Sequence, residues 1–516
     1  MKTLDSPGRQ WDVTARLPVQ DLRLSSDTVL LTGILIVAAG LRFVALGHNS
    51  IWLDEAVVAN VARARWQDIL PLLRAEDAHP PLYYLLMKAW ASVAGTGEAA
   101  LRLPSACFSL ASVALTYALM RRLSSGPVSL LSALLVSTAP FAIMSGQEAR
   151  MYPLLGMLAL AATLVLLVGV EQDQWWQWVM YTTAATLAIY THYLGLFVLA
   201  AHGGWVIRYE RRRLGRWLTT MAVAAAFYAP WVPSLVYQAA HAHAWFLSPL
   251  YGDKPPFLKL GDLLGLFAFG GSLFRMPSYF LSGTPLTPSE QLVVFLPFLA
   301  VLGSGIASLS RDGRALALLG LPPAIAVGGM QLVALVSPAF IARWFSFLLP
   351  FYAMVTAEGV FALARAIHGR LDRTVAVITA GLLLYNLAVL NRYYLDPAFR
   401  PYQWRSAAAL VEQKFMPSDA LLYGDPGNKA AFTYYFRKRV LSMTLLPRPD
   451  FAAIQQLPAG SRRVWLIVAP PFSDAMLQQT LSALRTSFVF VAGSRMNGTG
   501  VYPWVYLFET KPPAQR

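Results

Sequence analysis

Cysteine and charged residues are scarce in this chain of 516 residues. The single cysteine, Cys107, falls within an apolar segment, which excludes an intrachain disulfide and a cysteine-based metal site. Charged residues make up 13% of the chain and hydrophobic residues 56%, whereas soluble domains usually carry about 25% charged residues. The composition therefore predicts a protein that lies in a bilayer.

The chain also lacks a phosphate-binding loop of the form GxxxxGK followed by Ser or Thr, which argues against an ATP-driven pump. Acids are outnumbered: 27 Asp and Glu stand against 42 Lys and Arg, a net charge of +15. In a soluble protein this excess would suggest nucleic-acid binding, but here many arginines form short runs between apolar segments. That is the positive-inside pattern of membrane proteins, so no nucleic-acid partner is expected.

Apolar stretches near the length of about 20 residues that crosses a bilayer core recur along the chain. They lie at 28–47, 103–120, 127–144, 152–170, 177–191, 193–207, 217–236, 291–309, 315–336, 344–364 and 374–391. Residues 1–27 mix basic and acidic residues, and the apolar run behind them has no convincing small-residue cleavage site, which indicates a cytoplasmic segment before a retained signal anchor. We expect a polytopic α-helical membrane protein with about 11 transmembrane helices.

The segment 79–95 is apolar too, but it contains Lys88. Counting it as a crossing would place Arg121, Arg122 and every later basic cluster outside, against the positive-inside rule. Parity therefore predicts that this segment dips in without crossing and that residues 48–102 form one large outer loop. The apolar face of a helix lying on the membrane is expected from Trp66, Ile69, Leu70 and Leu73.

The composition changes again near the end of the last apolar stretch. Short β-like runs occur at Ala420–Tyr423, Val464–Val468, Phe488–Val491 and Tyr506–Phe508, and helix-like stretches near 403–415 and 474–486. We therefore expect a transmembrane domain at 28–395, of the GT-C type discussed below, followed by a small α/β extracytoplasmic domain at 396–516. An odd number of crossings places this domain on the side of the first outer loop.

Two adjacent acids, Asp54 and Glu55, follow the first crossing directly. Acids at such a place are costly enough to suggest function, although either could simply cap the helix that follows. The topology brings further ionisable and aromatic residues to the same outer ends: His79, Arg102, Glu148, Arg150, Tyr152, His192, Tyr193 and Arg343. Taken singly, each arginine could also be snorkelling toward lipid head groups, and His192 could be a satisfied residue at a helix end.

Displacement at a sugar carbon, with a lipid phosphate as the leaving group, needs such a set of side chains. The growing charge of the phosphate needs fixed cations, and arginine supplies bidentate donors. The acceptor hydroxyl needs a base, and one carboxylate, ionised at neutral pH, is sufficient.

At these residues the sequence resembles the GT-C glycosyltransferases, which include the protein O-mannosyltransferases and the aminoarabinose transferase acting on lipid A. The motifs, in the family's order, are LDEAVVA (53–59), AHPPLYYLLMKAW (78–90), LRLPSACFS (101–109), SGQEARMYPLL (145–155), THYLGLF (191–197) and Arg343-Trp344 opening a helix that reaches Pro350. No single motif is decisive, but the ordered set over the first 350 residues is specific.

The resemblance implies an inverting transfer in which Asp54 is the general base, beside Glu55, and in which outer-loop cations bind the phosphate of a polyprenyl-phosphate sugar. The donor-binding candidates are His79, Arg102, Arg150 and Arg343, and the substrate-binding candidates are Glu148, Tyr152, His192 and Tyr193. The sequence departs from the family pattern at two positions. The aminoarabinose branch has Lys in place of His79, which bears on the charge of the phosphate site. Family members often have Tyr in place of Trp344, which is a mild departure.

Two other patterns are weaker. The pair Glu171 and Asp173 looks like the acid-x-acid motif of nucleotide-sugar enzymes but falls in a short loop that should be cytoplasmic. The pair His241 and His243 could hold a metal, yet histidines beside aromatic residues more often pack at an interface. No cofactor is specified, and assistance by a divalent metal ion stays open.

Two rival functions stay open. A transporter or flippase of a lipid-linked sugar would bind substrate at its cations without catalysis, although transporters usually place ionisable groups near the bilayer midplane. A noncatalytic assembly subunit would tolerate loss of Asp54. We expect an enzyme in the cell's inner or plasma membrane, with its site on the extracytoplasmic side and a lipid, glycan or protein as acceptor.

Overall fold

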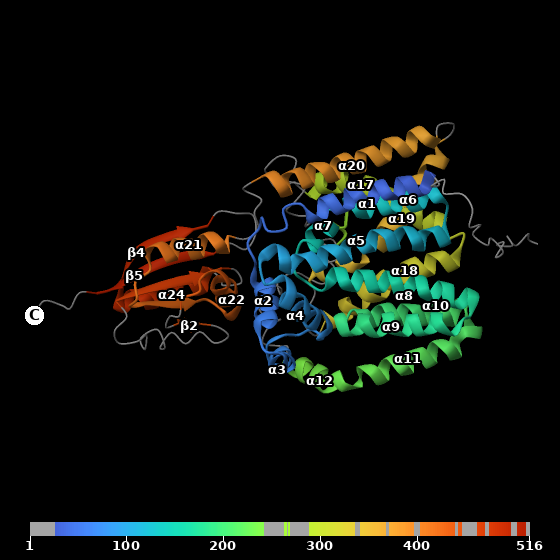
Figure 1. The fold of residues 1–516 in the computed structure, drawn as a ribbon. Helices are drawn as coiled ribbons and strands as arrows, with labels where there is room; N and C mark the ends of the chain where they lie inside the picture. The colour runs from blue at the N-terminus through green and yellow to red at the C-terminus, as the bar shows by residue number, and fades with distance from the viewer. Residues whose placement is uncertain are drawn as a thin grey trace, which may run out of the picture.

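The structure is a computed structural model, and it describes residues 26–241, 263–265, 267–268, 288–335, 341–367, 371–396, 403–438, 442–445, 462–469, 474–496 and 503–511. Figure 1 shows long helices running side by side, with a β-sheet beyond one end of them. Three short helices of the first outer loop lie at that end: α2 (Leu53–Arg63), α3 (Trp66–Glu76) and α4 (Leu82–Ala94).

Each stretch expected to cross the membrane overlaps a helix or a broken helix. The helices are α1 (Ser26–Phe43), α5 (Glu98–Leu123), α6 (Gly126–Thr138), α7 (Pro140–Gly146), α8 (Tyr152–Gln172), α9 (Trp175–Thr191), α10 (Gly195–Tyr209), η1 (Arg211–Arg213), α11 (Leu214–Tyr228), η2 (Ala229–Trp231), α12 (Val232–His241), α17 (Pro288–Leu309), α18 (Gly313–Val333), η3 (Ala342–Leu348), α19 (Leu349–Ala366) and α20 (Leu371–Leu395). Within the described residues, seven helices are long and apolar enough to cross, or eight if the bent pair α6–α7 is one span. The polytopic helical class is confirmed, and the number of crossings stays a prediction.

Burial separates the inner helices from the outer ones. In α8 and α19, 72% and 78% of the apolar window is buried inside the protein, against 11% in both α1 and α20. The peripheral helices α1 and α20 therefore expose their apolar side chains at the surface of the bundle, where contact with lipid is favourable. An inner helix can place polar groups at its end without exposing them to lipid.

The bend between α6 and α7 depends on a buried arginine. The two helices meet at 57°, and Pro140 has no amide hydrogen for the carbonyl of Val136, four residues earlier. Arg42 is fully buried, and it donates hydrogen bonds to the carbonyls of Val136 at 3.0 Å and Ser137 at 2.9 Å. The arginine thus replaces lost backbone partners, and it fixes the direction of α7, which leads into the loop 147–151.

At the end of the bundle away from the sheet, arginines of two basic clusters form ion pairs with the acids that follow α8 or lie at its end. Arg122 contacts Glu171 at 3.1 Å, and both Arg213 and Arg216 contact Asp173. The two acids of the acid-x-acid motif, Glu171 and Asp173, are therefore ion-pair partners of arginines in these basic clusters. The ends of α5 and α8 and the start of α11 accordingly lie together.

We predict that this end is cytoplasmic and that the sheet is external. Reporter fusions after Arg122, Arg213 and Arg370 should read cytoplasmic, and one after Asp396 should read external, because basic loops are retained on the inside. An external reading after Arg122 would mean that the segment 79–95 crosses and would overturn this topology. The short α4, 13 residues long, is consistent with a segment that does not cross.

The surface helix of the first loop differs in part from expectation. Ile69 and Leu73 are fully buried against the protein, whereas Trp66 and Leu70 are 56% and 47% exposed. The face expected to lie wholly on the membrane is thus split, because α12 packs against α3 and covers part of it.

The C-terminal residues form a five-stranded sheet of order β2-β1-β3-β5-β4. Strands β2, β1 and β3 run parallel to one another, and β5 is antiparallel to both of its neighbours, β3 and β4. The strands are β1 (Asp419–Tyr423), β2 (Ser442–Thr444), β3 (Arg463–Val468), β4 (Phe488–Arg495) and β5 (Trp504–Thr510), and the helices are α21 (Trp404–Lys414), α22 (Pro426–Tyr435) and α24 (Asp474–Ser487). The four β-like runs of the sequence overlap β1, β3, β4 and β5.

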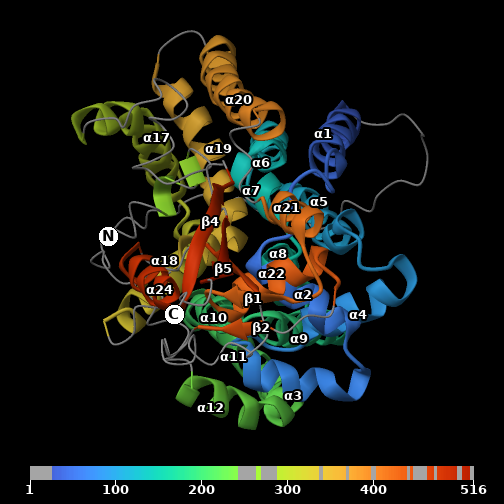
Figure 2. The same ribbon diagram turned by 90° about the vertical axis from the view of Figure 1, so that its left-hand side faces the viewer.

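Helix α22 joins this region to the first outer loop. The hydroxyl of Tyr435 accepts a hydrogen bond from the amide of Ile51 at 2.6 Å, and the hydroxyl of Tyr434 donates to the carbonyl of Thr96 at 2.7 Å. Figure 2, which looks onto the sheet, shows α22 lying over α2. Helix α22 therefore binds Ile51, which precedes the Asp-Glu pair, and Thr96, near the other end of the same loop.

Candidate active site

Asp54 stands in the first turn of α2, where a helix N-terminus favours a carboxylate. Its Oδ2 accepts a hydrogen bond from Nη2 of Arg343 at 2.7 Å and lies 3.8 Å from Nη2 of Arg150. Its Oδ1 has no hydrogen-bond partner within the described residues. The side chain is 28% exposed. One oxygen is thus held by cations while the other can reach a substrate.

Arg343 comes from η3, 289 residues after Asp54 along the chain. Its guanidinium lies over the ring of Trp52, with Cζ 4.3 Å from the ring centroid, which suits a cation–π contact. This stacking fixes the plane of the guanidinium beside Asp54. The only basis in the sequence for predicting that Asp54 and Arg343 meet was their position at the outer ends of their segments.

Glu55 and Arg102 form a separate, enclosed pair. Glu55 is fully buried, and Arg102 binds it through Nε at 2.7 Å and Nη2 at 2.6 Å. Arg102 also donates to three backbone carbonyls at the end of the first crossing, those of Leu46, Asn49 and Ser50. These five hydrogen bonds take up the five donors that an arginine has.

This geometry bears on the roles expected for Arg102 and Glu55. Arg102 was expected to bind the donor phosphate and Glu55 to stand beside the base, but neither has a polar atom left for a substrate. Glu55 also accepts the amide of Ala149 at 2.8 Å. The pair instead ties α2 to the end of α1 and to the loop 147–151, and so positions Asp54.

The loop 147–151 contributes Glu148 and Arg150. Burial raises the pKa of Glu148 to about 7, against the opposing pull of Arg343. Its carboxylate has no hydrogen-bond or ion-pair partner in the part of the chain that the structure describes. Arg150 is 97% buried, and its Nε likewise lacks a partner. Both residues thus have polar atoms that no described residue of the chain satisfies.

The sequence analysis missed Asp77, which lies two residues before His79. Oδ1 of Asp77 is 2.5 Å from Nδ1 of His79, and its second oxygen accepts the hydroxyl of Tyr84. Burial disfavours the charged carboxylate, but His79 and Arg150 outweigh it and hold the pKa of Asp77 below its usual value. Asp77 therefore orients His79 through Nδ1 of its ring. The only signal was an acid beside the His-Pro-Pro motif.

His192 adjoins His79, with the ring centroids 5.1 Å apart. Its Nδ1 accepts the amide of Leu194 at 3.1 Å, while its Nε2 is buried and has no partner within the described residues. Burial, reinforced by His79 and Arg150, lowers the pKa of His192 well below its usual value. A neutral ring bonded in this way carries its proton on Nε2, which is an unused donor.

Beside the two histidines lies a cavity of about 210 Å³, mostly apolar in its lining. Helices α10, α12, α18 and η3 contribute Phe197, Leu235, Gln238, Ala239, Met330 and Trp344 to its lining, and the loops before α4 and α10 contribute Ala78, His79, His192, Tyr193 and Leu194. The hydroxyl of Tyr193 donates a hydrogen bond to the side-chain oxygen of Gln238. The hydroxyl of the nearby Tyr152 is buried and unpartnered within the described part of the chain.

The structure thus gathers most of the predicted residues in one place. Asp54, Arg150 and Arg343 meet directly, and His79, Tyr152 and His192 adjoin them through ring contacts. Within the described residues no group of three or more His, Cys, Asp or Glu could hold a metal ion. His241 turns to the carbonyl of Tyr237 in its own helix, and His243 lies outside the described residues.

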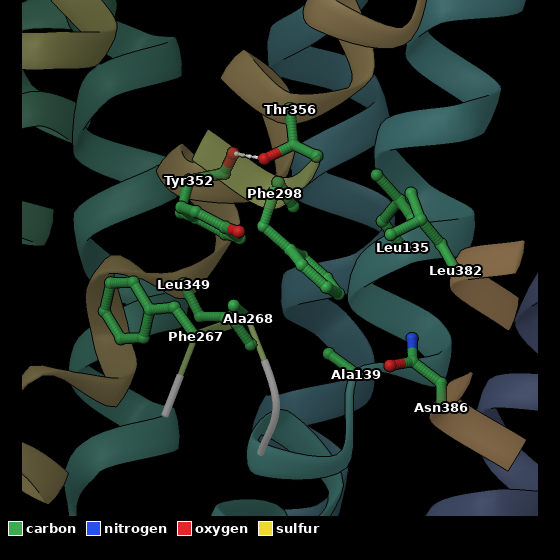
Figure 3. A pocket seen from close by; sticks show the side chains of 11 residues that line it. Leu135, Ala139, Phe267, Ala268, Phe298, Leu349, Tyr352, Thr356, Leu382 and Asn386 are labelled. Atoms are coloured by element: carbon green, nitrogen blue, oxygen red, sulfur yellow. Dashed lines mark hydrogen bonds between the residues drawn. The ribbon is translucent and has the colours of Figure 1, made fainter. Parts of the chain in front are cut away.

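A second cavity, inside the bundle, has a different character. It measures about 40 Å³ and lies among α6, α17, α19 and α20, with Phe267 and Ala268 closing one side (Figure 3). Its lining is apolar apart from the polar groups of Tyr352, Thr356 and Asn386. Among the described residues that line it there is no acid, base or cation.

Comparisons with known proteins agree with this arrangement. Residues 78–237 match the family described as dolichyl-phosphate-mannose-protein mannosyltransferase. ArnT from Cupriavidus metallidurans in the apo state superposes with a TM-score of 0.58 at 16% identity, covering 94% of this chain and 98% of that one. The same protein bound to undecaprenyl phosphate gives 0.56 at 16% identity, covering 93% and 97%.

An apo oligosaccharyltransferase from Archaeoglobus fulgidus gives a TM-score of 0.55 at 12% identity, covering 95% of this chain and 75% of that one. No curated protein matches the sequence. The shared fold and the matching family confirm the resemblance to GT-C glycosyltransferases that the ordered motifs predicted.

Proposed function

We propose that this chain, a membrane glycosyltransferase of the GT-C type that resembles ArnT and the protein O-mannosyltransferases, transfers a sugar from a polyprenyl-phosphate donor to an acceptor on the outer face of the plasma membrane, with inversion. The observation that carries the proposal is the contact of Asp54 with Arg343 and Arg150 at the outer helix ends. A similar fold with undecaprenyl phosphate bound supports the choice of donor.

Asp54 is the general base in this proposal. An acceptor hydroxyl attacks the anomeric carbon of the sugar and passes its proton to Oδ1 of Asp54, while the bond from that carbon to the phosphate oxygen breaks. The polyprenyl phosphate leaves with the electron pair, and attack from the opposite side inverts the anomeric centre. Because the cations hold Oδ2, the accepting oxygen has a fixed position.

The leaving phosphate is stabilised by donors that are already in place. Arg343, Arg150 and the Asp77-oriented His79 lie around the base. The buried Nε2 of His192 has an unused hydrogen bond. Preorganised donors of this kind strengthen as the phosphate oxygen gains charge. Glu148, with its pKa at about 7, is partly protonated at neutral pH and can donate to or accept from a sugar hydroxyl.

The apolar cavity of about 210 Å³ suits the first isoprene units of the carrier. His79 and His192 stand at its rim, so a phosphate at that end would meet the cations while the lipid chain enters between α10, α12 and α18. The apolar lining favours hydrocarbon over sugar. The same cavity would serve a flippase, so catalysis has to be tested separately.

His79→Ala should lower kcat/KM for the donor by roughly 10- to 100-fold, since loss of a charge-assisted hydrogen bond costs about 1.5–3 kcal/mol. Because the substitution also removes the imidazole partner of the buried Asp77 carboxylate, transfer is normalised to the amount of folded protein. Steady-state transfer with purified protein provides the measurement. His241→Ala, an exposed histidine bonded within its own helix turn, is the matched control. Unaltered donor kinetics for His79→Ala would remove this residue from the phosphate site.

A further inference from the structure

A cavity of about 450 Å³ separates the first outer loop from the C-terminal sheet region. Its walls come from α2, α3, α22 and the end of β2, and they combine Val57 and Val61 with the polar side chains of Asn60, Asp77, Lys429 and Thr433. The volume falls within the range of about 300–1,000 Å³ that is typical of ligand pockets. The groups proposed to hold the donor phosphate do not line this cavity. Asp77, which orients His79, does.

The cavity follows the face of α2 that carries the base. Val57 and Val61 lie three and seven residues after Asp54, a spacing that places all three on one side of a helix. An object in this cavity therefore rests against the helix face whose first turn holds the reactive carboxylate.

Residues 77–79 form the partition between this cavity and the apolar one. Asp77 lines the first, while Ala78 and His79 line the second. The two spaces therefore meet at the Asp77–His79 pair, close to Asp54. A displacement with inversion needs its nucleophile and its leaving group on opposite sides of the reacting carbon, and two cavities on either side of residues 77–79 suit this requirement.

We infer that the cavity between α2, α3 and α22 is the acceptor subsite and that it takes a hydroxyl-rich molecule, such as a sugar unit, with an apolar face. The assignment rests on the proposed function. Amide, hydroxyl and charged groups on its walls can bind hydroxyls, and the valines give a surface for the C–H face of a sugar ring. Asp77 and Lys429 carry opposite charges, so the lining does not select a strongly charged acceptor.

The wall formed by α22 is held in place. Asp425 caps the helix by accepting the amide of Asn428 at 2.9 Å. A Cβ on Gly427 would lie 3.2 Å from Cδ2 of Leu53, so the glycine allows the first turn of α22 to approach the residue next to Asp54. Tyr434 and Tyr435 anchor the far end of the helix. The acceptor subsite is thus built jointly by the first loop and the C-terminal region.

Blocking this cavity chemically tests the inference. In a Cys107→Ala background, Thr433→Cys and, separately, Lys429→Cys place a thiol on the cavity wall, and Ser406→Cys places one on the exposed surface of α21 as the matched control. Each full-length protein in native membranes is assayed before and after a bulky maleimide. The assay follows labelled sugar from polyprenyl-phosphate mannose or aminoarabinose into membrane acceptors, and native mass spectrometry measures binding of polyprenyl phosphate.

Labelling at position 433 or 429 should abolish transfer and leave polyprenyl phosphate binding as it was before labelling, whereas labelling at position 406 should change neither. Transfer that survives labelling at both cavity positions overturns the inference, and so does a parallel loss of transfer and of polyprenyl phosphate binding. If the unsubstituted protein consumes no polyprenyl-phosphate sugar, it is the proposed function that fails.

Discussion

Asp54→Asn should reduce sugar transfer by about 10²–10⁴-fold while the protein still binds polyprenyl phosphate, because an amide cannot accept the acceptor's proton. The substitution keeps the size of the side chain, and asparagine can still serve at the start of a helix. The contact of Oδ2 with Arg343 is replaced by a weaker one to a neutral oxygen, so a modest loss of donor affinity is expected as well. Transfer in nanodiscs, normalised to folded protein, is the measurement.

The matched control is Asp68→Asn, which neutralises an exposed acid on α3 whose partner is Arg65. A cap role alone would make Asp54→Asn cost no more than about 1 kcal/mol of stability with turnover intact. Nearly normal transfer by Asp54→Asn would end the proposed mechanism.

Arg102→Ala should greatly reduce the amount of folded protein, because breaking a buried ion pair by removing one partner costs about 3–5 kcal/mol. The substitution leaves Glu55 buried without its cation and frees three backbone carbonyls near residues 46–50. Thermal unfolding followed by size-exclusion chromatography in detergent measures the effect. Glu55→Ala should act in the same direction.

Arg63→Ala is a suitable control for Arg102→Ala, since it removes a more exposed arginine from the neighbouring α2. The result that would contradict the structural role is a normally folded Arg102→Ala protein with a raised KM for the donor. That outcome would restore the phosphate-binding role that the sequence suggested.

The membrane architecture could be predicted because hydrophobic length and arginine placement are properties of the sequence itself. Parity alone indicated that the segment 79–95 does not cross, and the structure forms only a 13-residue helix there. The partners of Glu171 and Asp173 could not be predicted, because the sequence of one loop does not show which arginines of other segments lie beside it.

The clustering of outer ionisable residues could be predicted for the same reason, but the choice of partner within the cluster could not. Arg102 and Arg343 both stand at the outer ends of their segments and look equivalent in sequence. The path of residues 46–50 turns three carbonyls toward Arg102 and so makes it structural, while Arg343 stays half-buried beside Asp54. Asp77 was missed because a single acid in a loop has no periodic or motif signal.

Sugar transfer by the purified protein tests the central claim most directly. The protein is reconstituted in nanodiscs, which have no second compartment, and supplied with a panel of polyprenyl-phosphate sugars and membrane-extracted acceptors. Mass spectrometry should show a glycosylated acceptor and one polyprenyl phosphate released per transfer, NMR of the product should show the inverted anomeric configuration, and Asp54→Asn should form both products about 10²–10⁴-fold more slowly. A flippase or an assembly subunit would leave every donor unconsumed in nanodiscs, and that result would contradict the account.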